Sequence, residues 1–168
     1  MSKPFIARGS RVIRCESCLL LKRVCICSHK VECTAHARFW LLMHHNETFK
    51  PTNTGRLISD CIQGTESFRW SRTEPDPSFI EALSAPDIDP YIVFPEGEGY
   101  EGRMVEFEPK EGRVPVFIIL DGTWRQARRM FRHSRYLDDL PVIEPTSSMP
   151  TAYRLRKASV PGQLCTAE

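Results

Sequence analysis

The sequence has no apolar run long enough to cross a membrane, so no membrane partner is expected. Residues 1–8 also lack the apolar stretch of a secretory signal, which predicts a cytoplasmic protein. A strong excess of charge is missing too, because 23 basic residues face 21 acidic ones and the net charge is only +2. Such a balance does not by itself require a nucleic-acid partner. Internal repeats and low-complexity tracts are absent as well, which excludes solenoid and array architectures.

What the chain does contain is enough apolar side chains for one core. Hydrophobic residues make up 41% of its 168 residues, which fits one domain with at most a small appendage. The charge is unevenly distributed, since residues 8–30 and 123–135 are basic and residues 74–111 are acidic. The basic stretches can bind nucleic acid locally. In a reducing cytoplasm the seven cysteines are expected to be thiols or metal ligands rather than disulfides.

Four of these cysteines lie close together near the N-terminus. They form a C-x2-C pair and a C-x-C pair, at Cys15, Cys18, Cys25 and Cys27. Four thiolates from two short turns can complete the tetrahedral shell that Zn²⁺ prefers, so residues 1–35 are expected to form a segment with a structural zinc site. An iron–sulfur cluster uses the same ligand type and is the alternative, whereas a redox pair is disfavoured because no βαβ pattern surrounds it. Lys22 and Arg23 lie among the ligands and are candidate nucleic-acid contacts.

Residues 116–131 combine a strand, a turn and a helix. Residues 116–120 are apolar and mostly β-branched or aromatic, which predicts a strand buried on both faces of a parallel sheet. Thr123 and Gln126 have capping-box spacing, so a helix is expected to begin there. Asp121 would then lie at the carboxyl end of a central strand, where open α/β sheets bind ligands. Four arginines share one side of the predicted helix: Arg125, Arg128, Arg129 and Arg132. From spacing alone, a turn aspartate and a solvated arginine face are the commoner explanation.

Further apolar runs predict an α/β fold, with a mostly parallel sheet and helices on both faces. Strands are expected at residues 37–43, 67–70, 91–94, 140–143 and 153–156, and residues 103–109 also alternate like a strand. Helices are expected from Asn53 or Thr54 to Ile62, and at residues 78–83.

Residues 97–102 match the letters of a G-x-G-x-x-G dinucleotide motif. That motif needs a helix to begin after the glycines, so that backbone N–H groups meet a phosphate. Here a strand-like pattern follows instead, and Glu98 and Glu101 would repel a pyrophosphate. We therefore reject a dinucleotide site and interpret this stretch as an acidic loop.

The string Asp121-Gly122-Thr123-Trp124 resembles the D-x-T-W signature of the DTW-domain family. Members of this family resemble tRNA-uridine aminocarboxypropyltransferases. Residues 44–47 resemble the family's H-P-x-E motif, with His45 where proline is usual. The remaining motifs follow in family order: the four-cysteine segment of bacterial members, N-T-x-R-L at residues 53–57, a strand ending in F-P at 91–95, Y-R-L-R at 153–156 and T-x-E at 166–168.

This resemblance implies a SPOUT-like core at residues 36–168, preceded by the zinc-binding segment. It implies an enzyme that transfers the 3-amino-3-carboxypropyl group of S-adenosylmethionine to N3 of a uridine in tRNA. Asp121 would be the general base or the group that orients the N3 proton, with Thr123 and Trp124 as further catalytic candidates. Capping the helix and anchoring it in the core are the ordinary roles for these last two residues.

The resemblance also implies two sets of binding residues. The candidate cofactor contacts are Glu47, Thr54, Arg56, Phe94, Pro95, Leu120, Arg154, Arg156, Thr166 and Glu168. The candidate RNA contacts are Arg125, Arg128, Arg129, Arg132, Lys22 and Arg23. Family members continue past the T-x-E motif with a helical region that this sequence lacks. The alternatives are a SPOUT-like RNA methyltransferase, a non-catalytic zinc-ribbon RNA-binding module, and an inactive fragment.

Overall fold

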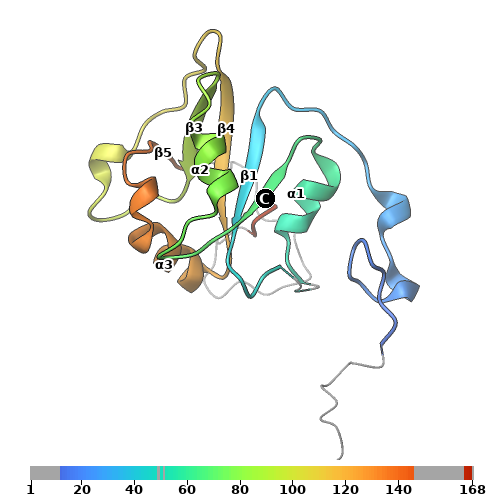
Figure 1. The fold of residues 1–168 in the computed structure, drawn as a ribbon. Helices are drawn as coiled ribbons and strands as arrows, with labels where there is room; N and C mark the ends of the chain where they lie inside the picture. Colours follow the sequence, from blue (N-terminus) through green and yellow to red (C-terminus); the bar gives the residue numbers. More distant parts are fainter. Residues whose placement is uncertain (1–11, 49, 51, 146–164, 168) are drawn as a thin grey trace, which may run out of the picture.

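The computed structural model describes residues 12–48, 50, 52–145 and 165–167. Within them the chain forms an α/β fold around a five-stranded sheet whose strands are all parallel, in the order β2-β1-β4-β3-β5 (Figure 1). The predicted fold class is therefore confirmed. The strand expected at residues 153–156, together with Arg154, Arg156 and Glu168, lies outside the described residues.

Most of the predicted elements form close to their expected bounds. The sheet and helices comprise β1 (Arg38–Met43), α1 (Gly55–Cys61), β2 (Glu66–Arg69), α2 (Pro77–Leu83), β3 (Ile88–Val93), β4 (Val114–Asp121), α3 (Trp124–His133) and β5 (Val142–Ile143). Short 3-10 turns lie at Lys22–Val24, Cys27–His29, Glu101–Arg103 and Arg135–Leu137. The G-x-G-x-x-G letters end within the 3-10 turn Glu101–Arg103, and the next element is β4 and not an α-helix, in agreement with the rejection of a dinucleotide site.

The strand predicted at residues 103–109 was wrong. Met104 forms an isolated bridge with Val142, and the N–H of Val105 donates to the carbonyl of Val142 at 2.9 Å. Beyond that point Val105 and Phe107 are exposed. The reason is that β5 is two residues long, so it offers no further backbone groups with which an alternating segment could pair.

The central position of β4 fixes where the strands end. It lies between β1 and β3, and Met43 of β1 is in register with Asp121 of β4. The carboxyl ends of these two strands therefore meet at one edge of the sheet. Loops that follow parallel strands converge at this edge, which is the usual position of a ligand site in an open α/β sheet.

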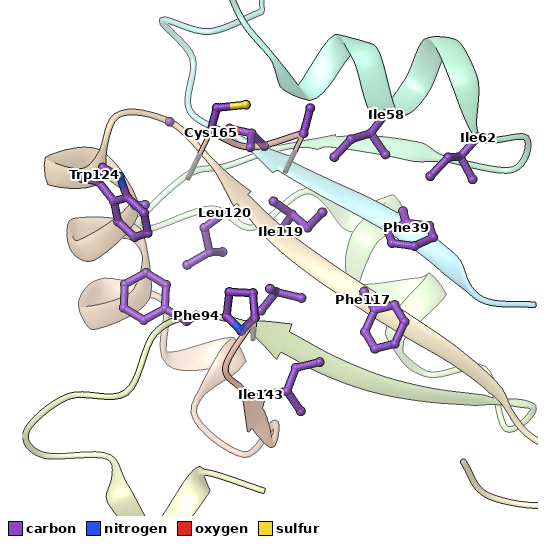
Figure 2. Close-up of a pocket in the computed structure, with 16 residues that line it drawn as sticks. Phe39, Ile58, Ile62, Phe94, Phe117, Ile119, Leu120, Trp124, Ile143 and Cys165 are labelled. Carbon is purple, nitrogen blue, oxygen red and sulfur yellow. The ribbon is translucent and has the colours of Figure 1, made fainter. Parts of the chain in front are cut away.

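The two faces of the sheet differ in how they are covered. One face carries Trp40, Leu42, Ile118 and Leu120, and it packs against α2 and α3 in a single hydrophobic core. Phe79 of α2 lies at its centre and makes edge contacts with Trp40 and Phe68 at centroid distances of 5.9 and 5.1 Å. Helix α1 covers part of the opposite face, as predicted for a sheet with helices on both faces (Figure 2).

Strand β4 is less completely buried than its sequence predicts. Val116, Ile118 and Leu120 are buried in the core, but Phe117 and Ile119 on the other face are only half-buried. They are partly exposed because they line a pocket that α1 does not fill.

The N-terminal segment carries the four cysteines and rests against α1 (Figure 1). Lys30 forms an ion pair with Asp60 at 2.7 Å and donates to the Ser17 hydroxyl at 3.1 Å. The Arg56 guanidinium donates to the Ser17 carbonyl, and the N–H of Cys33 donates to the Cys61 carbonyl at 2.6 Å. These contacts tie the segment to the sheet domain. Among the described residues, no helix combines the length and hydrophobicity that crossing a bilayer requires.

Candidate functional site

The carboxylate of Asp121 is buried at the carboxyl edge of the sheet. Only 1% of the residue is exposed, and its backbone carbonyl accepts a hydrogen bond from the N–H of His44 at 3.0 Å. Its side chain accepts a hydrogen bond from the Asn53 amide at 2.6 Å and another from Thr166. Asp121 thus lies at the predicted strand end, but it is enclosed rather than exposed as a turn aspartate would be.

Asn53 joins this carboxylate to a second one. Its amide nitrogen also donates to Glu47 at 3.2 Å, and its amide oxygen accepts from the backbone N–H of Arg56 at 3.1 Å. Glu47 is 4% exposed and is paired with Lys50 at 2.9 Å. The side chain that caps α1 is therefore that of Asn53, one of the two caps predicted. The same side chain holds the two buried acids side by side.

Gly55 allows the first turn of α1 to approach the Asp121 carboxylate closely. A Cβ atom at residue 55 would lie 2.9 Å from the carboxyl carbon of Asp121, nearer than real Cβ contacts come. The carboxylate and the helix start therefore fit together only because this residue has no side chain.

Burial raises the pKa of Asp121 above its ordinary value. Hydrogen bonds from Asn53 and Thr166 oppose the shift, the negative charge of Glu47 adds to it, and the charge of Lys50 opposes it. A carboxylate with a raised pKa is a stronger base than one in water, and this is the change that a general base working near neutral pH requires.

A pocket of about 370 Å³ lies beside Asp121, on the sheet face that α1 only partly covers. Its size falls within the range of small-molecule sites, about 300–1,000 Å³. In Figure 2, Ile58 and Ile62 of α1 border it on one side, Trp124 of α3 closes one end, and Phe39 and Phe117 lie along its floor. The lining is mostly apolar, as is usual for small-molecule sites.

Asp121 itself is not among the residues that line this pocket. Leu120 and Gly122, its neighbours in the chain, do line it, and so does Thr166, which hydrogen-bonds to the Asp121 carboxylate. The carboxylate therefore lies directly behind the pocket wall, and Thr166 stands between it and the pocket.

The structure divides the predicted cofactor contacts into two groups. Phe94, Leu120 and Thr166 line the pocket. The others that the structure describes lie elsewhere: Glu47 and Thr54 are buried near Asn53, the Pro95 carbonyl accepts from Tyr100, and Arg56 contacts the cysteine segment.

Thr123 and Trp124, the other two catalytic candidates, have different surroundings. The Thr123 hydroxyl accepts from the backbone N–H of Gln126 at 3.4 Å and donates to the Gln126 side chain at 2.8 Å, while that side chain also accepts from the N–H of Thr123 at 2.7 Å. The predicted capping box is therefore complete. Trp124 lines the pocket and is positioned to contact a ligand directly (Figure 2).

The four arginines of α3 share an exposed face, as the sequence predicts, whereas Ala127, Met130 and Phe131 of the same helix are buried. The arginines are not among the pocket-lining residues. They form a cationic surface on the same helix whose Trp124 and Ala127 line the pocket. Lys22 and Arg23 are exposed on the cysteine segment.

The four cysteines fit a tetrahedral metal ion. Their sulfur atoms all lie within 4.8 Å of one another, with Cys15 and Cys27 at 3.6 Å and Cys18 and Cys25 at 3.7 Å. Zn–S bonds of about 2.3 Å in a tetrahedron place the sulfurs about 3.8 Å apart, close to these values. Backbone N–H groups of Cys18 and Ser17 lower the pKa of Cys15 to about 6, whereas side-chain contacts with the other three cysteines raise the pKa of Cys25 to about 12. Without a metal, the cluster therefore favours the thiolate at Cys15 and the thiol at Cys25.

Sequence reasoning missed two parts of the site. It assigned Asn53 only a capping role, and it treated Phe39, Phe117 and Ile119 as ordinary core residues. The signal for the second part was available, since alternate residues of a strand face opposite sides of a sheet. Nothing in the local spacing indicated that one side would be left partly open.

The comparisons with known proteins agree with the resemblance found in the sequence. No solved structure matches the chain. The sequence model described as the DTW domain matches residues 12–168, from before Cys15, the first candidate metal ligand, to beyond Thr166. Because the match spans nearly the whole chain, the protein belongs to the DTW-domain family, the family of the tRNA-uridine aminocarboxypropyltransferases, which is associated with tRNA modification.

Proposed function

We propose that the protein transfers the 3-amino-3-carboxypropyl group of S-adenosylmethionine to N3 of a uridine in tRNA. The observation that carries this proposal is the position of the D-x-T-W motif. Its Gly122 and Trp124 line the pocket, and its Asp121 lies behind the pocket wall with a raised pKa. One motif therefore contributes both a ligand-binding wall and a candidate base.

The pocket suits the apolar parts of the donor. Phe94, Leu120 and Trp124 offer apolar and aromatic surface to an adenine ring, and the Thr166 hydroxyl is a polar group on the same wall. S-adenosylmethionine, when bound, supplies the electrophilic carbon next to its sulfonium. The protein must then hold the acceptor in line with that carbon and assist loss of the N3 proton.

Asp121 is our candidate for that second task. As uracil N3 bonds to the carbon, the carbon–sulfur bond breaks, 5′-methylthioadenosine leaves and the N3 proton must be accepted. Asp121 lies behind the wall, so we propose that Thr166 links its carboxylate to the pocket by their hydrogen bond. Asn53 and Gly55 would be positioning residues, because they fix the carboxylate without lining the pocket.

The arginines of α3 and the four cysteines would have binding and structural roles instead of catalytic ones. Arg125, Arg128, Arg129 and Arg132 form an exposed cationic face beside the pocket and would contact tRNA phosphates. Zinc on the four cysteines would be structural, because four thiolates leave no open coordination position for a substrate.

Mass spectrometry of the modified tRNA tests this proposal. Unmodified tRNA is incubated with the protein and S-adenosylmethionine that is isotopically labelled either in the methyl group or in the carboxypropyl carbons. We expect label from the carboxypropyl carbons, and none from the methyl group, in one uridine nucleoside. Methyl label in the nucleoside would instead establish a methyltransferase, and an unchanged tRNA would contradict the proposed reaction.

A further inference from the structure

Three aromatic rings follow one another beside Asp121. Trp70, which follows β2, is buried and its indole N–H donates to the Ser134 hydroxyl at 2.8 Å. The ring of His44, which follows β1, stacks on it with centroids 5.4 Å apart and planes inclined by 19°. The ring of His45 lies against His44 in a tilted arrangement, with centroids 4.2 Å apart and planes inclined by 32°. The stack thus leads from the core to an exposed residue.

Hydrogen bonds hold the middle ring in one orientation. Nδ1 of His44 accepts from the backbone N–H of Asn46 at 3.3 Å and lies 3.2 Å from the amide nitrogen of Gln126. Because Nδ1 is an acceptor, the ring is the neutral Nε2–H tautomer. Burial lowers the pKa of His44, and the nearby charges of His45 and Arg129 lower it as well, which agrees with a neutral ring.

The helix that contacts this stack, α3, also carries exposed arginines. Gln126, which contacts His44, lies on α3 one turn before Arg129, and Arg125 lies one turn before Arg129 on the same side. Both arginines are exposed, and the positive charge of Arg129 lowers the pKa of His44. An exposed flat ring with arginines beside it matches the two parts of a nucleotide, because the base can stack and the phosphate can pair with a guanidinium.

We propose that His45 is a stacking platform for an unpaired nucleobase of the tRNA substrate, with Arg129 and Arg125 on the adjoining phosphates. The proposal rests on the proposed function in naming tRNA as the ligand. The backbone N–H of His44 donates to the Asp121 carbonyl at 3.0 Å, so the residue that carries the middle ring lies at the edge of the candidate active site. A base stacked on His45 would therefore hold the RNA next to the target uridine.

The platform is tested by direct binding of a single-stranded oligoribonucleotide that carries 2-aminopurine, whose fluorescence falls when it stacks. We compare the wild-type protein with His45→Ala, His45→Phe and, as a matched control, His36→Ala, since His36 is also exposed but lies before β1. Loss of one base–aromatic stack weakens binding by about fivefold to twentyfold at the lower end of the known range. We expect this loss and a loss of quenching for His45→Ala only, with His45→Phe close to wild type.

Three results would overturn the platform. His45→Ala could bind and quench like wild type, His45→Phe could be as weak as His45→Ala, or His45→Ala could weaken binding of S-adenosylmethionine, measured by calorimetry, instead of RNA. The last result would assign the ring to the adenine of the donor. No transfer step enters this assay, so it separates the two proposals. A platform that binds RNA without any group transfer would remove only the proposed reaction, whereas transfer that does not need His45 would remove only the platform.

Discussion

At the scale of single residues, the burial of Asp121 raises the pKa of its carboxyl group, as a general base requires, and also lowers the stability of the fold when that group is ionised. Its raised pKa means that the folded state disfavours the ionised carboxylate. Below the ordinary carboxyl pKa, Asp121 is protonated in both the folded and the unfolded state. As the pH rises, the unfolded chain loses this proton before the folded protein does. The wild-type protein therefore loses stability as the pH rises through the pKa of folded Asp121.

Asp121→Asn should remove the free-energy cost of keeping an ionised carboxylate buried. Its amide oxygen can still accept from Asn53, and it carries no charge at any pH, so we expect the variant to be more stable than wild type at pH 7. The advantage should shrink as the pH falls toward the ordinary carboxyl pKa. Urea unfolding midpoints at several pH values measure this difference. A variant that is less stable than wild type by the same amount at every pH would contradict a buried, ionised Asp121.

At the scale of elements, α3 joins the site to the proposed RNA surface. Its N-terminus is fixed by the capping box of Thr123 and Gln126, one side lines the pocket through Trp124 and Ala127, and the arginine face points to solvent. The two ends of this connection can be tested separately. Substitution of the capping residue Thr123 tests the start of α3, and the salt dependence of tRNA binding tests the arginine face.

Thr123→Ala should destabilise the protein by about 1 kcal/mol, because it removes the side chain that accepts from Gln126. Thr123→Ser should retain most of the stability that Thr123→Ala loses, since the serine hydroxyl can also cap the helix. Chemical denaturation gives the free energy of unfolding, and the transfer rate is measured on folded protein. A Thr123→Ala variant that is as stable as wild type but inactive would assign Thr123 to catalysis instead of capping.

Arg129→Gln should weaken tRNA binding and reduce the slope of log K against log salt by about 1, as expected when one phosphate contact is lost. Arg113→Gln is the matched control, because Arg113 is also exposed but precedes β4 at the opposite edge of the sheet. Binding titrations at several salt concentrations supply the slopes. Equal slopes for the two variants would mean that the arginine face of α3 does not bind the RNA.

At the scale of the whole molecule, the cysteine segment contacts α1 and contributes no residue to the hydrophobic core. Ser17 lies within the C-x2-C turn and receives both Arg56 and Lys30, so the geometry of this turn governs the contact. The hydrophobic core, by contrast, is built from the sheet, α2, α3 and the turns that follow them.

Removing the metal should therefore loosen the segment without unfolding the sheet. We expect a chelator to release one zinc ion per chain, and amide exchange to accelerate in residues 12–30 while β1 and β4 stay protected. Exchange followed by mass spectrometry locates the change, and Lys30→Ala, which removes the ion pair with Asp60 but leaves the cysteines in place, serves as the control. Simultaneous loss of protection throughout the sheet would contradict a separate segment.

The features that the sequence predicts well are those that depend on neighbouring residues. The apolar run at 116–120 and the spacing of Thr123 and Gln126 are local, and the strand and the capping box form as expected. The contacts that were missed are distant in sequence. Asn53 reaches Asp121 across 68 positions and Arg56 reaches Ser17 across 39, and no periodicity encodes such pairs. The contact between Arg56 and Ser17 was therefore not foreseen, and the role of Arg56 as a cofactor contact stays a prediction.

The central claim is that the buried carboxylate of Asp121 assists transfer to a uridine. Its most direct test is the rate of aminocarboxypropyl transfer by Asp121→Asn in a single turnover, measured by mass spectrometry of the tRNA. Binding of tRNA and of S-adenosylmethionine is measured on the same protein. The account predicts that both ligands still bind and that transfer falls by at least the 10²-fold typical of a lost general base. Transfer at the wild-type rate would remove Asp121 from the mechanism.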